Sequence, residues 1–93
     1  MKQNPNDHHR LLAAALQSKI DRLQAAKKKV RSLDPEIIAR AIDAIGSVEG
    51  AAIWLTSPAF GLDGKVPADF AATAKGRSKV LNLLGRIDHG VLA

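Results

Sequence analysis

Residues 11–31 read LLAAALQSKIDRLQAAKKKVR, and their apolar positions recur at the spacing of an α-helix. The positions that share one helical face lie three or four residues apart: Leu12, Leu16, Ile20, Leu23, Ala26 and Val30. The cations Lys28, Lys29 and Arg31 end the stretch, where the negative end of a helix dipole favours them. The spacing therefore predicts one long helix over residues 7–31.

Four further helices are expected downstream, because residues that favour the start of a helix stand there before apolar stretches with helical spacing. The residues that would begin them are Asp34 with Pro35, Ser47, Pro67 and Thr73. Gly46 can end the second helix in a left-handed conformation, and the fourth helix is brief, ending near Ala72. The inward side chains are expected to be Ile38, Ala41, Ile42 and Ile45, then Val48, Ala52 and Leu55, and finally Val80, Leu84, Ile87 and Val91. Trp54 is expected in the core, with Phe60 and Phe70 packed near it.

The composition restricts the class of protein. The chain has 93 residues, 46% of them hydrophobic but only 3% aromatic, and it contains neither tyrosine nor cysteine. Such a composition favours helices over strands, so the predicted fold is a small all-α single domain, a bundle of about five helices with a long first helix. The absence of cysteine excludes disulfides and thiolate metal sites, and it favours the cytoplasm. We expect neither a signal peptide nor a membrane span.

The positive charge is concentrated in the first third of the chain. Residues 1–33 contain eight basic and two acidic residues, whereas residues 34–93 contain six basic and seven acidic ones. The chain therefore divides into a basic N-terminal helix region (1–33) and a helical remainder (34–93). The densest cluster is Lys27, Lys28, Lys29 and Arg31. This cluster is either a solvated helix end or a patch that contacts DNA phosphates. Because no aromatic residue is interleaved with it, stacking on the bases of single-stranded nucleic acid is disfavoured.

The residues that catalysis requires are scarce. The sequence contains no nucleophile, zinc-binding, nucleotide-binding or dinucleotide-binding motif. His8 and His9 are adjacent and cannot both face one metal from a helix, and Gly61 to Gly64 form a turn. We therefore expect no enzymatic activity, no cofactor and no metal.

The C-terminal end is unusually apolar. It reads GRIDHGVLA over residues 85–93, without a polar tail. Chain ends usually fray in water, and a frayed end gains nothing from apolar side chains. The end either packs back onto its own domain or docks into a partner.

From about residue 45 to residue 93 the sequence resembles the toxin-binding domain of the Xre/MbcA/ParS-like antitoxins. The resemblance rests on AIWL at 52–55, PAFGLDGKVP at 58–67 and GRSKVLNLLGRIDHGV at 76–91. It implies an antitoxin of a bacterial type II toxin–antitoxin pair whose partner is a RES-domain toxin. Such toxins act on NAD, by degrading it or by transferring ADP-ribose to a protein. The antitoxin would bind and neutralise the toxin by blocking its NAD pocket with the C-terminal segment.

The resemblance also implies which residues contact the toxin: Arg86, Asp88, His89, Gly90, Val91, Leu92, Ala93 and, where the family usually has arginine, Lys65. The alternative function is a small DNA-binding transcriptional regulator that acts through its basic first helix. Family members commonly repress their own promoter together with the toxin, so operator DNA is a possible second partner.

Overall fold

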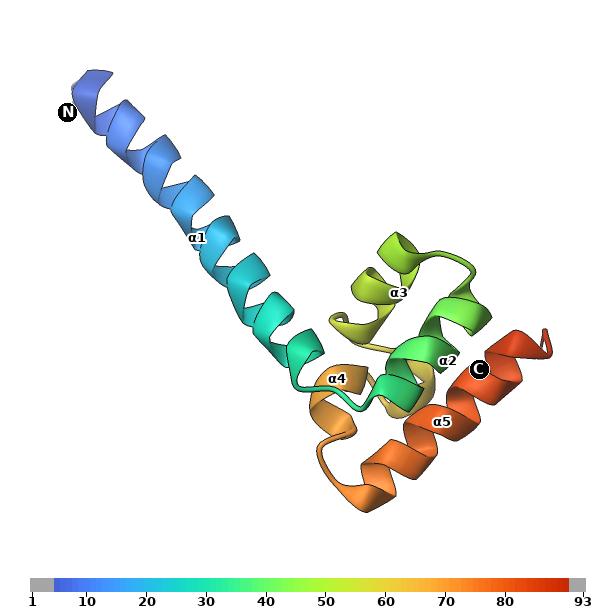
Figure 1. Ribbon diagram of the computed structural model, residues 1–93. Coiled ribbons are helices and arrows are strands. Elements are labelled where there is room, and N and C mark those ends of the chain that lie inside the picture. Colours follow the sequence, from blue (N-terminus) through green and yellow to red (C-terminus); the bar gives the residue numbers. More distant parts are fainter. Residues whose placement is uncertain (1–4, 91–93) are drawn as a thin grey trace.

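The computed structural model describes residues 5–90, which form five α-helices and one short 3-10 helix (Figure 1). Their bounds are α1 Pro5–Arg31, α2 Pro35–Ile45, α3 Val48–Leu55, η1 Phe60–Leu62, α4 Pro67–Phe70 and α5 Ala74–Asp88. Within these residues no strand is present, and the one bridge of strand type joins Ala59 to Lys65. The predicted all-α fold is confirmed. No helix in the described part of the chain has both the length and the apolar character that crossing a bilayer requires.

The predicted helix starts are confirmed at the level of hydrogen bonds. The side chains of Asp34, Ser47 and Thr73 accept hydrogen bonds from the backbone N–H groups of Glu36, Gly50 and Gly76, at 2.8, 3.0 and 3.0 Å. Each bond satisfies an N–H group that has no partner within its own helix. Helix α2 ends as expected at Gly46, where φ is +96°. Helix α4 ends at Phe70, earlier than the sequence predicted.

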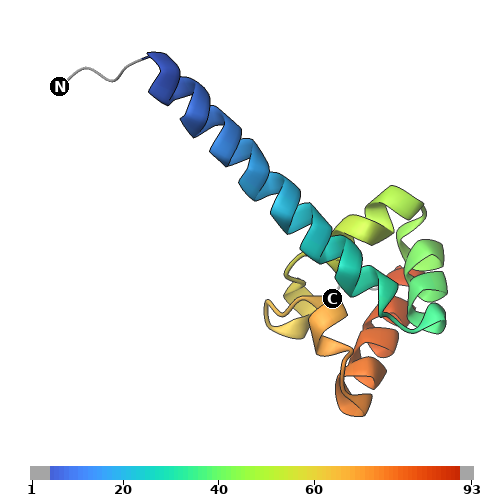
Figure 2. The same ribbon diagram turned by 60° about the vertical axis from the view of Figure 1, so that its left-hand side comes forward.

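The core lies between α2 and α5, with α3 and the loop after it closing one side (Figures 1 and 2). Its buried residues are Ile37, Ala41, Ala51, Leu55, Ala59, Leu62, Val80, Leu83 and Leu84. Helix α1 contributes none of them and extends away from the other helices, so the molecule measures 56 × 25 × 23 Å.

Two of the predicted inward sets need correction. In α3, Ala51 and Leu55 are buried, but Val48 is 63% exposed and Ala52 is also exposed. The reason is that α3 is apolar around most of its circumference, so spacing alone does not identify its buried face. In α2, Ile37 is the buried isoleucine, whereas Ile38, Ile42 and Ile45 are half-buried.

The aromatic residues also differ from the expectation. Trp54 and Phe70 are half-buried and pack against the core, but Phe60 is 91% exposed at the start of η1. The predicted packing of Phe60 near Trp54 is therefore wrong. The turn that follows η1 is anchored by Leu62, which is buried, and it does not need Phe60. Val91, which was expected to extend the apolar face of the last helix, lies outside the described residues.

An ion pair joins the first turns of α2 and α5. The Arg77 guanidinium donates from Nε to Asp34 at 2.7 Å and from Nη2 to Glu36 at 2.5 Å. The backbone N–H of Glu36, and then Arg77, hold the pKa of Asp34 below its ordinary value of 3.8, and the hydrogen bonds to the Asp34 and Glu36 carboxylates raise the pKa of Arg77. The pair links two helix starts that are more than forty residues apart in sequence.

Stability is therefore expected to fall at acid pH partly through Asp34. Its contribution is complete above pH 3.8 and is lost as pH falls from 3.8 to the lowered pKa of the folded state, because over that range the unfolded chain binds a proton that the folded protein does not. Asp34→Asn preserves a capping side chain but removes the charge. It should lower the melting temperature modestly near neutral pH and flatten the decline at acid pH. Thermal melts across pH would measure this, with Asp43→Asn, an exposed carboxylate of the same helix, as the control.

Candidate functional site

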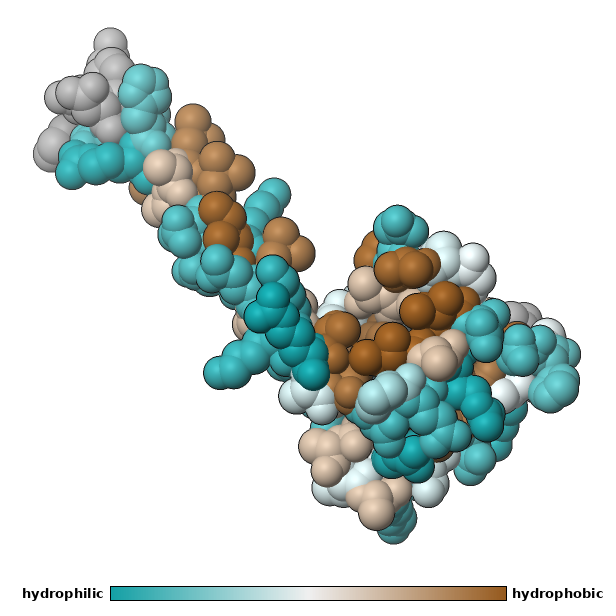
Figure 3. All heavy atoms as spheres, in the orientation of Figure 1, coloured by the Kyte–Doolittle hydropathy of each residue, from teal (hydrophilic) through white to brown (hydrophobic). Residues whose placement is uncertain are grey.

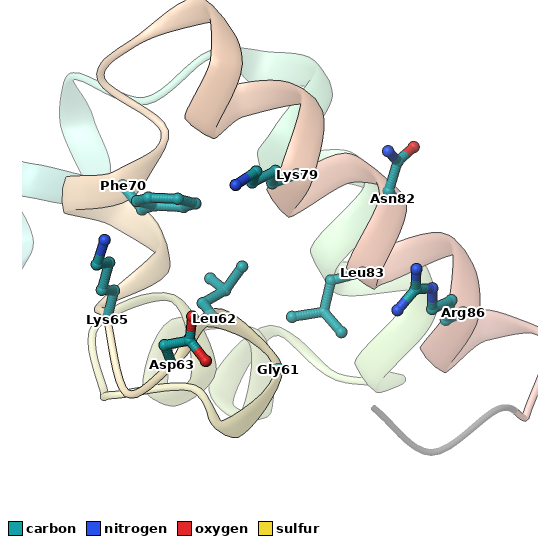
Figure 4. Close-up of a pocket in the computed structure, with 9 residues that line it drawn as sticks. All are labelled: Gly61, Leu62, Asp63, Lys65, Phe70, Lys79, Asn82, Leu83 and Arg86. Carbon is teal, nitrogen blue, oxygen red and sulfur yellow. The ribbon is translucent and has the colours of Figure 1, made fainter.

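A groove of about 320 Å³ lies between the η1 turn, α4 and the outer face of α5 (Figure 4). Its walls are formed by Gly61, Leu62, Asp63, Lys65, Phe70, Lys79, Asn82, Leu83 and Arg86. Two buried leucines form part of these walls, and most of the other side chains are polar. The groove is therefore an open, polar surface feature that rests on the edge of the core.

The groove carries positive charge. Three cations, Lys65, Lys79 and Arg86, surround it, and Asp63 is its one carboxylate. Within residues 5–90, none of these cations forms an ion pair. The Nζ atoms of Lys65 and Lys79 lie 4.9 and 5.8 Å from the centroid of the Phe70 ring. Such cation–π contacts position the two ammonium groups without neutralising them, so the groove can receive an acidic group.

The η1 turn positions Lys65. The backbone N–H of Ala59 donates to the carbonyl of Lys65 at 3.0 Å, which closes the loop. Asp63 has φ +56°, a left-handed conformation that aspartate tolerates better than most residues because its short side chain bonds locally. This confirms the predicted turn over Gly61 to Gly64 and gives a structural reason for the aspartate within it.

The structure brings together two of the residues predicted to contact a toxin and separates others. Lys65 and Arg86 line the same groove, although 21 positions separate them in sequence. Asp88 projects from the other side of α5, into a smaller hollow of about 230 Å³ beside Arg40 and Asp43. His89 follows α5 and is exposed, as is Gly90. The predicted contacts Val91, Leu92 and Ala93 lie outside the described residues.

Sequence reasoning named only Lys65 and Arg86 as site residues, so it missed the others that line the groove, among them Phe70, Lys79 and Asn82. Lys79, Asn82 and Arg86 follow one another at spacings of three and four, so they share one face of α5. That spacing is a signal that could have identified two of the three. Phe70 was assigned to the core, and the core does touch it, but its ring also faces the two lysines.

The basic residues predicted to contact DNA do not all point the same way. Lys29 donates to Asp69 of α4 at 3.1 Å. Lys27 and Arg31 line an apolar groove between α1 and α3, whereas Lys28 is exposed outside it. DNA binding by this cluster stays a prediction. Within the described residues, no group of three or more His, Cys, Asp or Glu side chains could hold a metal ion.

Comparison with known proteins finds a family match for the segment of the chain that contains the groove. Residues 40–90 match the family model of the Antitoxin Xre/MbcA/ParS C-terminal toxin-binding domain. A curated relative, the protein named Antitoxin Xre of Yersinia enterocolitica, is 37% identical over 54 residues. That alignment covers 57% of this chain and 36% of the relative, so the chain matches about a third of the relative's length. No solved structure matches the chain.

The matched segment includes more than half of the chain, and it contains α3, η1, α4, α5 and every residue of the groove. It follows that this chain belongs to the Xre/MbcA/ParS family of antitoxin C-terminal toxin-binding domains.

Proposed function

We propose that this chain is the antitoxin of a toxin–antitoxin pair, and that its groove and the end of α5 form the surface that meets the toxin. The proposal rests on one observation. Lys65 and Arg86, which the family resemblance indicates as toxin contacts, line a single cationic groove inside the family-matched segment. A groove of this kind offers a toxin a defined place to insert an acidic side chain or segment.

Charge and geometry indicate how the groove would bind. Arg86 can form a two-pronged bond with a carboxylate, because its guanidinium presents parallel N–H donors. Lys65 and Lys79 add point charges that Phe70 holds beside the groove. Opposite charges across an interface accelerate association and select among partners. An acidic strip on the toxin is therefore the partner chemistry that the groove fits.

The toxin that we propose is a RES-domain protein that consumes NAD or transfers ADP-ribose, and the segment from Arg86 to Ala93 would block its NAD pocket. An NAD pocket offers cationic or N–H donors to the pyrophosphate and an apolar slot to a ring. The carboxylate of Asp88 would take the place of the pyrophosphate, and Val91 with Leu92 would fill the slot. The chain itself would supply no catalytic group.

A binding measurement tests the role of the groove. Lys65→Glu combined with Arg86→Glu should weaken binding to the proposed RES-domain toxin by at least about tenfold, because attraction at the groove becomes repulsion. Titration calorimetry with the purified toxin measures the effect. The control pair, Arg22→Glu with Lys28→Glu, makes the same change of charge at exposed positions on α1, away from the groove, and should bind like the wild type. Equal affinity of both double variants would remove the groove from the interface.

A further inference from the structure

Helix α1 carries a row of large apolar side chains that the rest of the described structure leaves uncovered. Leu12 is 65% exposed, Leu16 60%, Ile20 45% and Leu23 70%. Ala26 and Val30 continue the row toward the base of the helix, where they become half-buried. Figure 3 shows hydrophobic side chains gathered along the side of α1 that is turned toward α3. We call the six residues the α1 stripe.

The molecule exposes more surface than a compact chain of its mass. Its accessible surface is 6947 Å², whereas a compact monomer of this mass exposes only about 5,200 Å². Its radius of gyration is 17.3 Å, against about 12 Å expected for a compact domain of this length. The surplus of about 1,700 Å² exceeds the roughly 800 Å² that each partner buries in a stable protein–protein interface. The extended α1 thus supplies enough surface for a dimer.

We propose that the α1 stripe packs against the α1 stripe of a second copy of this chain, with the two helices antiparallel. The pattern of the stripe is nearly symmetric about position 21, so a reversed copy matches it. In that register Leu12 lies opposite Val30 and Leu16 opposite Ala26, and Ile20 and Leu23 meet with an offset of one residue. A two-fold dimer requires this kind of self-complementary surface, in which residue i meets residue j and residue j meets residue i.

A second apolar surface lies where the antiparallel partner would end. A groove of about 370 Å³ separates the base of α1 from α3, and its apolar lining includes Val30, Ala52 and Ile53. Ile53 is 66% exposed in the single chain. Because Leu12 of the second copy would lie opposite Val30, it would reach this groove and cover Ile53. The groove therefore extends the stripe and does not compete with it.

Charge selects the antiparallel arrangement over the parallel one. Parallel helices in register would place Lys27 and Arg31, which border the apolar groove at the base of α1, beside the same two cations of the partner. In the antiparallel register, residues 27–31 lie opposite residues 11–15, which read LLAAA and carry no charge. Like charges held side by side are destabilising, so the reversed arrangement avoids a cost that the parallel one incurs.

Sedimentation equilibrium of the chain alone tests the proposal. The wild type should sediment at twice its 9.9 kDa mass at micromolar concentration. Leu16→Glu with Leu23→Glu should raise the dissociation constant more than a hundredfold and leave a monomer, because each leucine is buried only in the dimer. The control is Ala14→Glu with Ala25→Glu, which adds the same charge to the exposed opposite face and should stay dimeric. A monomeric wild type, or equal dissociation of the two variants, would overturn the proposal.

Single cysteines test the orientation, because the natural chain contains none. Under mild oxidation, a mixture of Leu12→Cys and Val30→Cys chains should form mixed disulfides, whereas Leu12→Cys alone should stay uncrosslinked. Efficient self-crosslinking of Leu12→Cys would show parallel helices and refute the antiparallel arrangement. Both tests use the chain without toxin, so failure of the proposed dimer is distinguishable from failure of the proposed antitoxin function.

Discussion

Removal of residues 86–93 is expected to abolish neutralisation of the toxin while the domain stays folded. The proposed contacts at the end of α5 are all removed, but every buried residue of the core lies at or before Leu84. Ile87, which packs against the core from the last turn, is only half-buried, so its loss should lower stability without unfolding the domain. In cells that express this truncated chain together with the proposed RES-domain toxin, growth and cellular NAD should both fall as they do without the antitoxin.

The control for this truncation removes a segment of equal length from the opposite end. A chain without residues 2–9 loses the free end of α1 but retains the α1 stripe, the groove and α5. It should restore NAD like the full chain. A shorter truncation, without residues 91–93, leaves α5 complete and tests the apolar end alone. Circular dichroism of each purified chain shows whether it is folded.

Three results would contradict the proposal. If the chain without residues 86–93 is folded and still restores NAD, the C-terminal segment does not block the toxin. If NAD never falls when the toxin is induced, the proposed NAD-consuming chemistry is wrong for this partner. If NAD falls and the folded full-length chain does not restore it, the pairing of antitoxin and toxin is wrong, and the basic first helix becomes the better guide to function.

The helix starts could be predicted from the sequence because local chemistry determines them. The side chains of Asp34, Ser47 and Thr73 each accept a hydrogen bond from a backbone N–H two or three residues later, and this bond involves no residue that is distant in sequence. The buried faces were harder to predict where a helix is apolar on several sides. In α3, only the packing against the rest of the domain distinguishes Ala51 from Ala52.

The groove could be predicted only in part, for a related reason. The family resemblance indicated Lys65 and Arg86 one by one, without placing them together. Their proximity depends on the way the η1 turn packs beside α5, and the contacts that fix this are distant in sequence. Phe70 illustrates the difficulty, because an aromatic residue at a helix end predicts core packing. Its second contact, with two lysines, appears only in three dimensions.

Gly76→Ala is expected to destabilise the domain by about 3 kcal/mol or more, and to lower its melting temperature by more than about 12 °C. Gly76 is buried in the first turn of α5, where that helix leaves the turn after α4. A Cβ atom there would lie 1.7 Å from the backbone oxygen of Phe70 and 2.8 Å from its carbonyl carbon. Backbone atoms cannot rotate aside, so α4 and α5 would have to separate. That movement would also disturb the Phe70 wall of the groove.

Gly85→Ala is the matched control, because it makes the same substitution in the same helix. Apart from the neighbouring residues and the backbone of its own helix, no heavy atom lies within 4 Å of a Cβ built at Gly85, and the position is inside α5. Alanine there should stabilise the chain by about 0.5–1 kcal/mol, since glycine loses more backbone freedom when a helix forms. Chemical denaturation of both variants measures the two effects. Equal stability of Gly76→Ala and the wild type would show that α4 can move away from α5 at little cost. The contact with Phe70 would then not explain why this position holds glycine.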